Sequence, residues 1–308
     1  MKTSKNILIV LMFCLIQLTS LAQQDPMYTH YMFNTLVVNP AYAGSRDALT
    51  LTAIHRSQWV GFKEAPITQT FTAHTPLRNE HIGIGLSVSN DKIGPTNNTS
   101  VFVDYAYKIG LTEKSQLALG LSVGATIFQV DLNSRQLDVQ NDPAFLNNIK
   151  NQVTPNFGFG AYYTRERFYA GISVPNLLEN SYFIQNNVSI ERKQRHYFFI
   201  TGTLLKITEN LAFKPTMLVK ITTAAPIEAD LTASFVIVKR LLVGAMFRSG
   251  DAVGGLVGFD ITDQFHLGYS YDWSYGIKTG TYNSGSHEVV LRYDILYNKK
   301  QIHSPRNF

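Results

Sequence analysis

Cysteine is nearly absent from this 308-residue chain, and the single one, Cys14, lies among the first 22 residues. Lys2 and Lys5 precede an apolar stretch, Ile7–Leu18, and small residues follow at Ser20-Leu21-Ala22. This order is typical of a secretory signal peptide, which is too short for a membrane span and is removed on export. We therefore expect residues 1–22 to be a signal peptide and the mature chain to lack cysteine, which excludes disulfides and thiolate chemistry.

The mature part also lacks long hydrophobic runs and a strong net charge. No segment approaches the ~18 continuous apolar residues of a membrane helix. Of the 27 Lys and Arg residues, 25 remain after Lys2 and Lys5, against 22 Asp and Glu. No run of basic residues is present to follow a nucleic acid, so we expect no nucleic-acid partner. Gly-rich phosphate loops and metal-ligand spacings are missing too, and the sequence therefore predicts no cofactor.

What the chain contains instead is a regular alternation of apolar residues with small or polar ones. Residues Gln116–Phe128 place apolar side chains at every second position, at Leu117, Leu119, Leu121, Val123, Ala125 and Ile127. Successive side chains of a strand point to opposite faces, so this period of two predicts β-strands. The pattern recurs in fourteen segments, near 49–59, 67–76, 81–89, 98–109, 115–129, 154–164, 168–174, 196–207, 211–222, 227–238, 241–249, 252–261, 264–273 and 286–297.

The connections between these segments differ in length in a regular way. Those after even-numbered segments are brief, whereas those after odd-numbered ones include Val130–Val153, Pro175–Arg195 and Ser274–Gly285. Outer-membrane barrels have short periplasmic turns and longer outer loops. The sequence thus predicts an all-β fold, a transmembrane antiparallel β-barrel of about 14 strands over residues 49–297 of an outer-membrane protein. A soluble sandwich or propeller fits less well, because neither needs this alternation of loop lengths and no blade-length repeat is present.

In this arrangement both termini, including the tail 298–308, lie in the periplasm, and the long loops lie at the cell surface. The strand register places charges of both signs on the lumen face, at Asp104, Lys108, Lys214, Lys220, Asp230, Arg248, Asp260, Asp272, Glu288, Arg292 and Asp294. Buried charges need partners or water. We expect either a lumen braced by ion pairs or a polar interior that receives a segment of a partner, and a lumen of this size can conduct or be plugged.

The histidines give no sign of an enzyme. We expect His74 and His266 to face the lumen, and hydroxyl groups are available on Ser57, Ser87 and Ser122. A hydrolase needs a base held against its nucleophile and oriented by a third group. Nothing in the spacing enforces that arrangement, so we expect no catalytic activity.

Residues 23–48 precede the first strand and do not alternate. Four of them have the spacing of one face of a short helix, namely Tyr28, Tyr31, Met32 and Leu36. Asp25 is a suitable N-cap, with Pro26 at the first helical position. This expected periplasmic helical segment could pack on the barrel rim, partly plug the lumen or dock a periplasmic partner, and the sequence leaves the three alternatives open.

Two stretches near the N-terminus resemble a known family. They are Gln-Asp-Pro at 24–26 followed by Asn39-Pro40-Ala41-Tyr42-Ala43-Gly44, and the region HRSQWVGFKEAPITQTFTAHTPL around Trp59. Both are similar to the PorP/SprF family of Bacteroidetes outer-membrane proteins, and the similarity covers essentially the mature chain. The resemblance implies a non-enzymatic, fourteen-stranded barrel that works with the type IX secretion system. It assigns no role to the motif residues Asp25, Pro26, Asn39, Pro40, Ala41 and Gly44.

Some members of that family belong to a motor-associated or peptidoglycan-linked apparatus, and others support the secretion and surface attachment of an adhesin, including gliding adhesins. We therefore expect this barrel to bind the C-terminal region of a secreted adhesin. Exposed aromatic and apolar loop residues suit such binding, and the candidates are Leu137, Phe145, Tyr182, Phe183 and Ile184. These loops could also simply fold over the barrel mouth. The alternatives are a general diffusion or nutrient porin, and a structural member engaged through Gln23–Gly44 with a peptidoglycan-linked periplasmic component.

Overall fold

The computed structural model describes residues 26–131, 149–184, 188–192, 194–223, 225–275 and 283–296. Two short 3-10 helices, η1 (Thr35–Val37) and η2 (Pro40–Tyr42), precede the strands. The strands are β1 (Ala48–Ser57), β2 (Ile67–Pro76), β3 (Ile82–Ile93), β4 (Thr96–Thr112), β5 (Ser115–Val130), β6 (Ile149–Arg165), β7 (Phe168–Val174), β8 (Ser181–Ile184), β9 (Val188–Arg192), β10 (His196–Thr203), β11 (Leu205–Lys206), β12 (Leu211–Thr222), β13 (Ala225–Ile237), β14 (Leu241–Arg248), β15 (Ala252–Asp260), β16 (Phe265–Ser274) and β17 (Ser286–Leu296).

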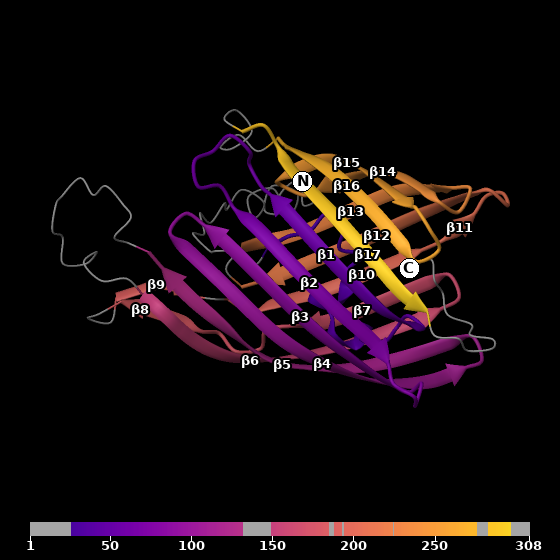
Figure 1. Cartoon of the computed structure of the whole chain (residues 1–308), viewed down its shortest axis with the longest axis horizontal. Coiled ribbons are helices and arrows are strands. Elements are labelled where there is room, and N and C mark those ends of the chain that lie inside the picture. Colours follow the sequence, from indigo (N-terminus) through magenta and orange to yellow (C-terminus); the bar gives the residue numbers. More distant parts are fainter. Residues whose placement is uncertain are drawn as a thin grey trace, which may run out of the picture.

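The main sheet closes on itself. From β1 to β7 and from β12 to β17 each strand pairs antiparallel with the next. β7 pairs with β10, β10 pairs with β12, and β17 pairs with β1, which closes the sheet. β11 adds only a two-residue extension beside β12, and β8 pairs with β9 in a separate hairpin. The closed sheet therefore has fourteen strands (Figure 1). This confirms the predicted antiparallel barrel, and every predicted segment coincides with a strand to within a few residues.

The two faces of the barrel differ as the alternation predicts. On β5, Leu121 and Val123 are 48% and 55% exposed, whereas the intervening Ser122 is buried. An outward apolar face and a polar interior are the pattern of a barrel that lies in lipid. No helix among the described residues is long and apolar enough to cross a membrane.

The two ends of the barrel carry different connections. Turns of a few residues join β2 to β3, β4 to β5 and β6 to β7 at one end, here called the short-turn end. The opposite end, here called the long-loop end, carries the segment between β1 and β2 and the β8–β9 hairpin, which projects beyond the neighbouring strands (Figure 1). The sequence predicts a loop for this hairpin, because four- and five-residue strands are too short to show a period.

The described part of the N-terminal segment, residues 26–44, forms turns and two 3-10 helices and not the predicted helix. Most of its local hydrogen bonds join residues three apart, as from the amide of Phe33 to the carbonyl of His30 at 2.9 Å. Residues from every side of the segment are buried, including Phe33 and Asn34 as well as Tyr31. The prediction of one apolar helical face was wrong because the barrel wall surrounds the segment, so residues on all its sides are buried.

Candidate functional site

The segment 26–44 lies inside the lumen and is called the plug below. Three residues of β2 mark its path along the barrel axis. The hydroxyl of Tyr28 lies 2.7 Å from that of Thr70, the Thr72 hydroxyl donates to Asn34 Oδ1 at 2.8 Å, and the Gly44 amide donates to His74 Nδ1 at 3.2 Å. Of the alternatives left open by the sequence, the structure places the described residues in the lumen.

The direction of the plug was not foreseen. β2 begins at the long-loop end, so Tyr28 lies nearer that end and Gly44 lies at the short-turn end, next to the start of β1. Pro26 lines a cavity together with Trp59 and Pro66 of the β1–β2 connection. The chain thus runs down the lumen before it turns into β1. Residue 26 lies towards the long-loop end, which differs from the expected place of the N-terminal segment at the short-turn end.

Glu288 on β17 anchors the upper part of the plug. Its Oε2 accepts the amide of Thr29 at 2.9 Å, and its Oε1 accepts the amide of His30 at 2.7 Å. The His30 ring nitrogen Nδ1 lies 2.8 Å from the same Oε1. Arg56 on β1 completes the group, with Nη1 3.2 Å from Glu288 and Nη2 2.8 Å from Asp272. These side chains are buried, so each ion is compensated by hydrogen bonds from the plug and the wall.

The motif Asn39–Gly44 fixes the lower part of the plug. Asn39 donates through Nδ2 to the carbonyls of Ala161 and Ile172 at 3.1 and 3.3 Å, and its Oδ1 accepts the amide of Ala41 at 3.0 Å. The side chain therefore caps η2 and also binds two barrel strands, with Pro40 at the first position of η2. The motif residues Asn39, Pro40, Ala41 and Gly44, to which the resemblance assigned no role, are structural elements of the plug.

Glycines on the barrel wall make room for this motif. A Cβ at Gly120 on β5 would collide with the backbone of Ala41, and one at Gly160 on β6 would collide with Asn39. At Gly44 the backbone has φ +66°, a conformation that L side chains rarely adopt, and Gly83 on β3 packs against it. The plug thus packs against glycines on the lumen face of the alternating strands.

Ion pairs brace the rest of the interior, as one of the two expectations for the lumen charges predicts. Arg248 binds Asp230 through Nε at 2.8 Å, and Lys220 lies 3.1 Å from Glu228. Most of the predicted lumen charges are buried, namely Asp104, Lys214, Lys220, Asp230, Arg248, Asp272, Glu288, Arg292 and Asp294. Arg56 was not among the predicted lumen residues. It follows the outward-facing His55, so the alternation itself places it on the lumen face.

Above the plug, the lumen widens into an outer cavity of about 750 Å³ at the long-loop end. The plug itself forms its floor through Pro26, Met27, Tyr28, Leu36, Val37, Val38 and Pro40. Polar groups such as Asp91 and Asp251 line the wall, and the nearby loop residues Val60 and Phe62 are 38% and 40% exposed. This end thus has a cavity lined by both polar and apolar side chains, next to exposed apolar loop residues.

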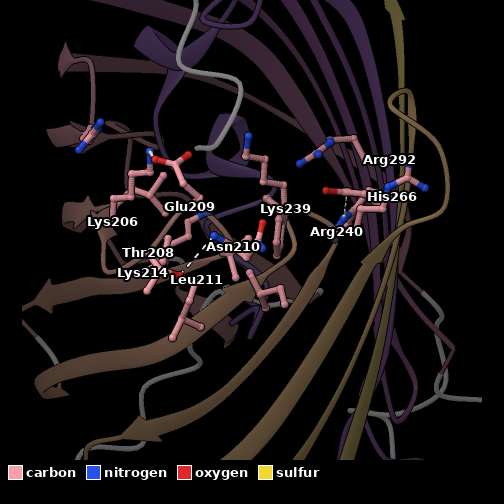
Figure 2. Close-up of a pocket in the computed structure, with 17 residues that line it drawn as sticks. Lys206, Thr208, Glu209, Asn210, Leu211, Lys214, Lys239, Arg240, His266 and Arg292 are labelled. Carbon is pink, nitrogen blue, oxygen red and sulfur yellow. Dashed lines mark hydrogen bonds and ion pairs between the residues drawn. The ribbon is translucent and has the colours of Figure 1, made fainter.

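Below the plug, a smaller pocket of about 200 Å³ opens at the short-turn end. Figure 2 shows its side chains, which come from the plug residue Phe33, the strands β11–β17 and the turns at this end of the barrel. Two acidic residues line it, Glu209 and Asp260. Six basic residues line it, namely Arg167, Lys206, Lys214, Lys239, Arg240 and Arg292. At the rim, a hydrogen bond from Lys206 at 2.6 Å lowers the pKa of Glu209.

The residues predicted to bind a partner are only partly placed. Tyr182, Phe183 and Ile184 lie on β8 of the hairpin at the long-loop end. Leu137 and Phe145, and the motif residue Asp25, lie outside the described residues. His74 binds the plug, and His266 lies 2.6 Å from Asp260, so both histidines have structural partners. In the described part of the chain, no group of three potential metal-ligating side chains occurs.

A comparison with protein families agrees with this architecture. Residues 20–293 match the family described as type IX secretion system membrane protein PorP/SprF. The chain belongs to this family. PorP/SprF proteins are membrane components of a secretion system by that description and not a known enzyme family. Among curated proteins, no relative matches the sequence.

Solved barrels resemble this PorP/SprF protein in fold. The monoaromatic hydrocarbon channel CymD has 8% sequence identity and a TM-score of 0.50, over 86% of this chain and 94% of CymD. Omp33 of Acinetobacter baumannii has 12% identity and a TM-score of 0.46, over 82% of this chain and 99% of Omp33. The NanC porin has 9% identity and a TM-score of 0.43, over 81% and 100% of the two chains. At such identities the likeness concerns the fold alone.

Proposed function

We propose that this PorP/SprF protein is a non-enzymatic outer-membrane barrel of the type IX secretion and gliding apparatus. It binds the C-terminal region of a secreted adhesin at its long-loop end, and thereby supports export of the adhesin and its attachment to the cell surface. The observation that carries the proposal is the plug, because a lumen filled at mid-height suits a docking platform and not a passage for solutes.

The orientation follows from the turns. Bacterial outer-membrane barrels keep their short turns in the periplasm, so the long-loop end of this barrel faces outwards. The outer cavity, the exposed Val60 and Phe62, and the β8–β9 hairpin then meet a polypeptide outside the cell. Apolar and aromatic side chains around a hollow provide the central contacts of many protein interfaces, with polar groups around them.

The plug also counts against the two alternative functions. A general diffusion porin needs a continuous aqueous lumen, whereas Thr29, His30 and Asn39 bind opposite walls of this one. A role for residues 23–44 as a periplasmic docking helix needs their side chains to be accessible. Tyr31 and Leu36, two residues of the predicted helical face, are 1% and 2% exposed.

The test is native purification in mild detergent through a tag after Phe308, with mass spectrometry of all polypeptides that co-elute. We expect a large secreted polypeptide, represented by its C-terminal peptides. The Tyr182→Ala/Phe183→Ala variant is expected to lose most of this polypeptide while the barrel keeps its heat-modifiable migration. Phe168→Ala serves as the control, since Phe168 is 41% exposed at the short-turn end.

Three results decide between the functions. Unchanged retention in the Tyr182→Ala/Phe183→Ala variant would remove the hairpin from the binding surface. Periplasmic partners alone would favour the structural role in the apparatus. A barrel that elutes alone and conducts ions steadily in planar bilayers would move the porin function to first place.

A further inference from the structure

The pocket at the short-turn end contains cations that no described residue neutralises by an ion pair. Lys214 on β12 is 4% exposed, and among the described residues no carboxylate lies within ion-pair distance of its Nζ. Its Nζ lies 5.1 Å from the centroid of the Phe33 ring. Burying an ammonium group without a counter-ion is costly. Such a group in a pocket wall therefore favours the binding of an anion.

Arg292 on β17 supplies a second cation at the same depth. Its guanidinium carbon lies 5.5 Å from the centre of the Phe33 ring, so Lys214 and Arg292 share one aromatic side chain of the plug. Arg292 Nε lies 3.5 Å from Asp294, a carboxylate that also binds Arg46 at 2.8 Å, and this Nε has no hydrogen-bond partner in the described structure. The Asp294 carboxylate is thus shared by the guanidinium groups of Arg46 and Arg292, so one of these two positive charges is not compensated by it.

The rim adds to this excess. Arg167, Lys239 and Arg240 line the pocket, and none of them has an ion pair with a described residue. The two acids are already engaged, Glu209 with Lys206 and Asp260 with His266. Figure 2 shows that Lys214, Lys239 and Arg292 approach the pocket from two different strands and a turn. Both the buried wall and the rim therefore favour a ligand with more than one negative charge.

We propose that this pocket is a binding site for a phosphate group that enters from the short-turn end, with Lys214 and Arg292 as its main ligands. A volume of about 200 Å³ accepts one such group, and it is below the ~300–1,000 Å³ of pockets for drug-sized ligands. A phosphate carries more charge than a carboxylate and matches the planar donors of arginine. The group can belong to free inorganic phosphate or to a phospholipid headgroup. This site is independent of adhesin binding at the opposite end.

A bound phosphate also affects the plug. Lys214 and Arg292 repel one another beside Phe33, and an anion bound to both offsets that repulsion. Phosphate is therefore expected to hold Phe33, and with it the plug, more firmly in place. The consequence is a thermal stability that rises with phosphate concentration beyond the effect of ionic strength.

The experiment uses the full barrel in an uncharged maltoside detergent. Inorganic phosphate is titrated by calorimetry and by thermal unfolding, with sodium chloride at matched ionic strength as the reference. Mixed micelles with phosphatidic acid, compared with phosphatidylcholine, test the headgroup as the source. Saturable binding of either phosphate form, with a rise in Tm, supports the site and identifies the source.

Two lysine variants separate this site from a general basic surface. Lys214→Met is expected to weaken phosphate binding by about tenfold or more, the loss of one charge-assisted hydrogen bond. Lys206→Met, at a rim lysine that is 41% exposed, is expected to change the affinity by less than about threefold. Without phosphate, Lys214→Met is expected to be at least as heat-stable as the parent, since it removes an unpaired buried charge.

Other results would overturn the proposal. They are no saturable binding of phosphate in either form, equal binding by Lys214→Met and the parent, or binding of a poly-glutamate peptide without binding of phosphate. Wild-type titration alone can give the first result, so the proposal stays testable if a variant fails to fold.

Discussion

Replacing Glu288 with Gln is expected to release the plug. The carboxylate accepts the amides of Thr29 and His30 and binds Arg56 and the His30 ring. Glutamine keeps the shape but has a single acceptor oxygen, and its amide nitrogen would face donors of the plug or of Arg56. Glu288→Gln therefore breaks a buried ionic group while it leaves the packing of β17 unchanged.

The size of the effect follows from burial. Glu288 is 0% exposed, and removing one partner of a buried ion pair typically costs ~3–5 kcal/mol. One factor of ten in population corresponds to ~1.4 kcal/mol. If the whole cost falls on the plug-bound state, the population with a displaced plug rises by roughly 10²–10⁴-fold.

A single cysteine can report this population, since Cys14 lies in the predicted signal peptide. Thr35→Cys places a thiol at a plug position that is 1% exposed and lines neither the outer cavity nor the short-turn pocket, so a maleimide reagent reaches it only when the plug moves. When reclosing is faster than labelling, the labelling rate follows the open population. We expect faster labelling with Glu288→Gln, together with ion conductance in planar bilayers.

Glu166→Gln is the matched control, because Glu166 pairs with Lys114 at the surface and its side chain is 58% exposed. Exposed pairs contribute ~0–1 kcal/mol, so this variant is expected to label at the parental rate. Equal labelling rates for Glu288→Gln and the parent, in barrels that migrate as folded, would refute the anchoring role of Glu288.

Two further changes test the wall glycines that make room for the plug and the lipid-facing side of the barrel. Gly160→Val is expected to increase labelling of Thr35→Cys, since any Cβ there collides with Asn39, whereas Gly255→Val on the outward face is expected to leave the labelling unchanged. Equal effects of the two variants would contradict the role of Gly160 in making room for the plug. Val123→Arg, outward-facing and 55% exposed midway along β5, is expected to destabilise the barrel by ~2–4 kcal/mol in urea unfolding from liposomes. Leu111→Arg, near the short-turn end of β4, is expected to cost ~0–1 kcal/mol, and an equal cost at both positions would place β5 outside the lipid.

The sequence by itself determined the barrel. Lipid on one side and a polar lumen on the other impose a period of two on each strand, so neighbouring residues of one segment suffice to predict it. The same register predicted lumen charges such as Arg248 and Asp230, whose pairing the structure confirms. The motif Asn39–Gly44 pointed to the correct family, although its role could not be read from the motif alone.

Only the tertiary structure decided what fills the barrel. The contacts that hold the plug join residues far apart in the chain, such as Thr29 with Glu288 at a separation of 259 positions and Asn39 with Ala161 at 122. No local pattern encodes such contacts, and they replace the helical hydrogen bonds that the spacing of Tyr28 to Leu36 predicts. The basic pocket has the same origin, because Phe33, Lys214 and Arg292 come together only when the sheet closes around the plug.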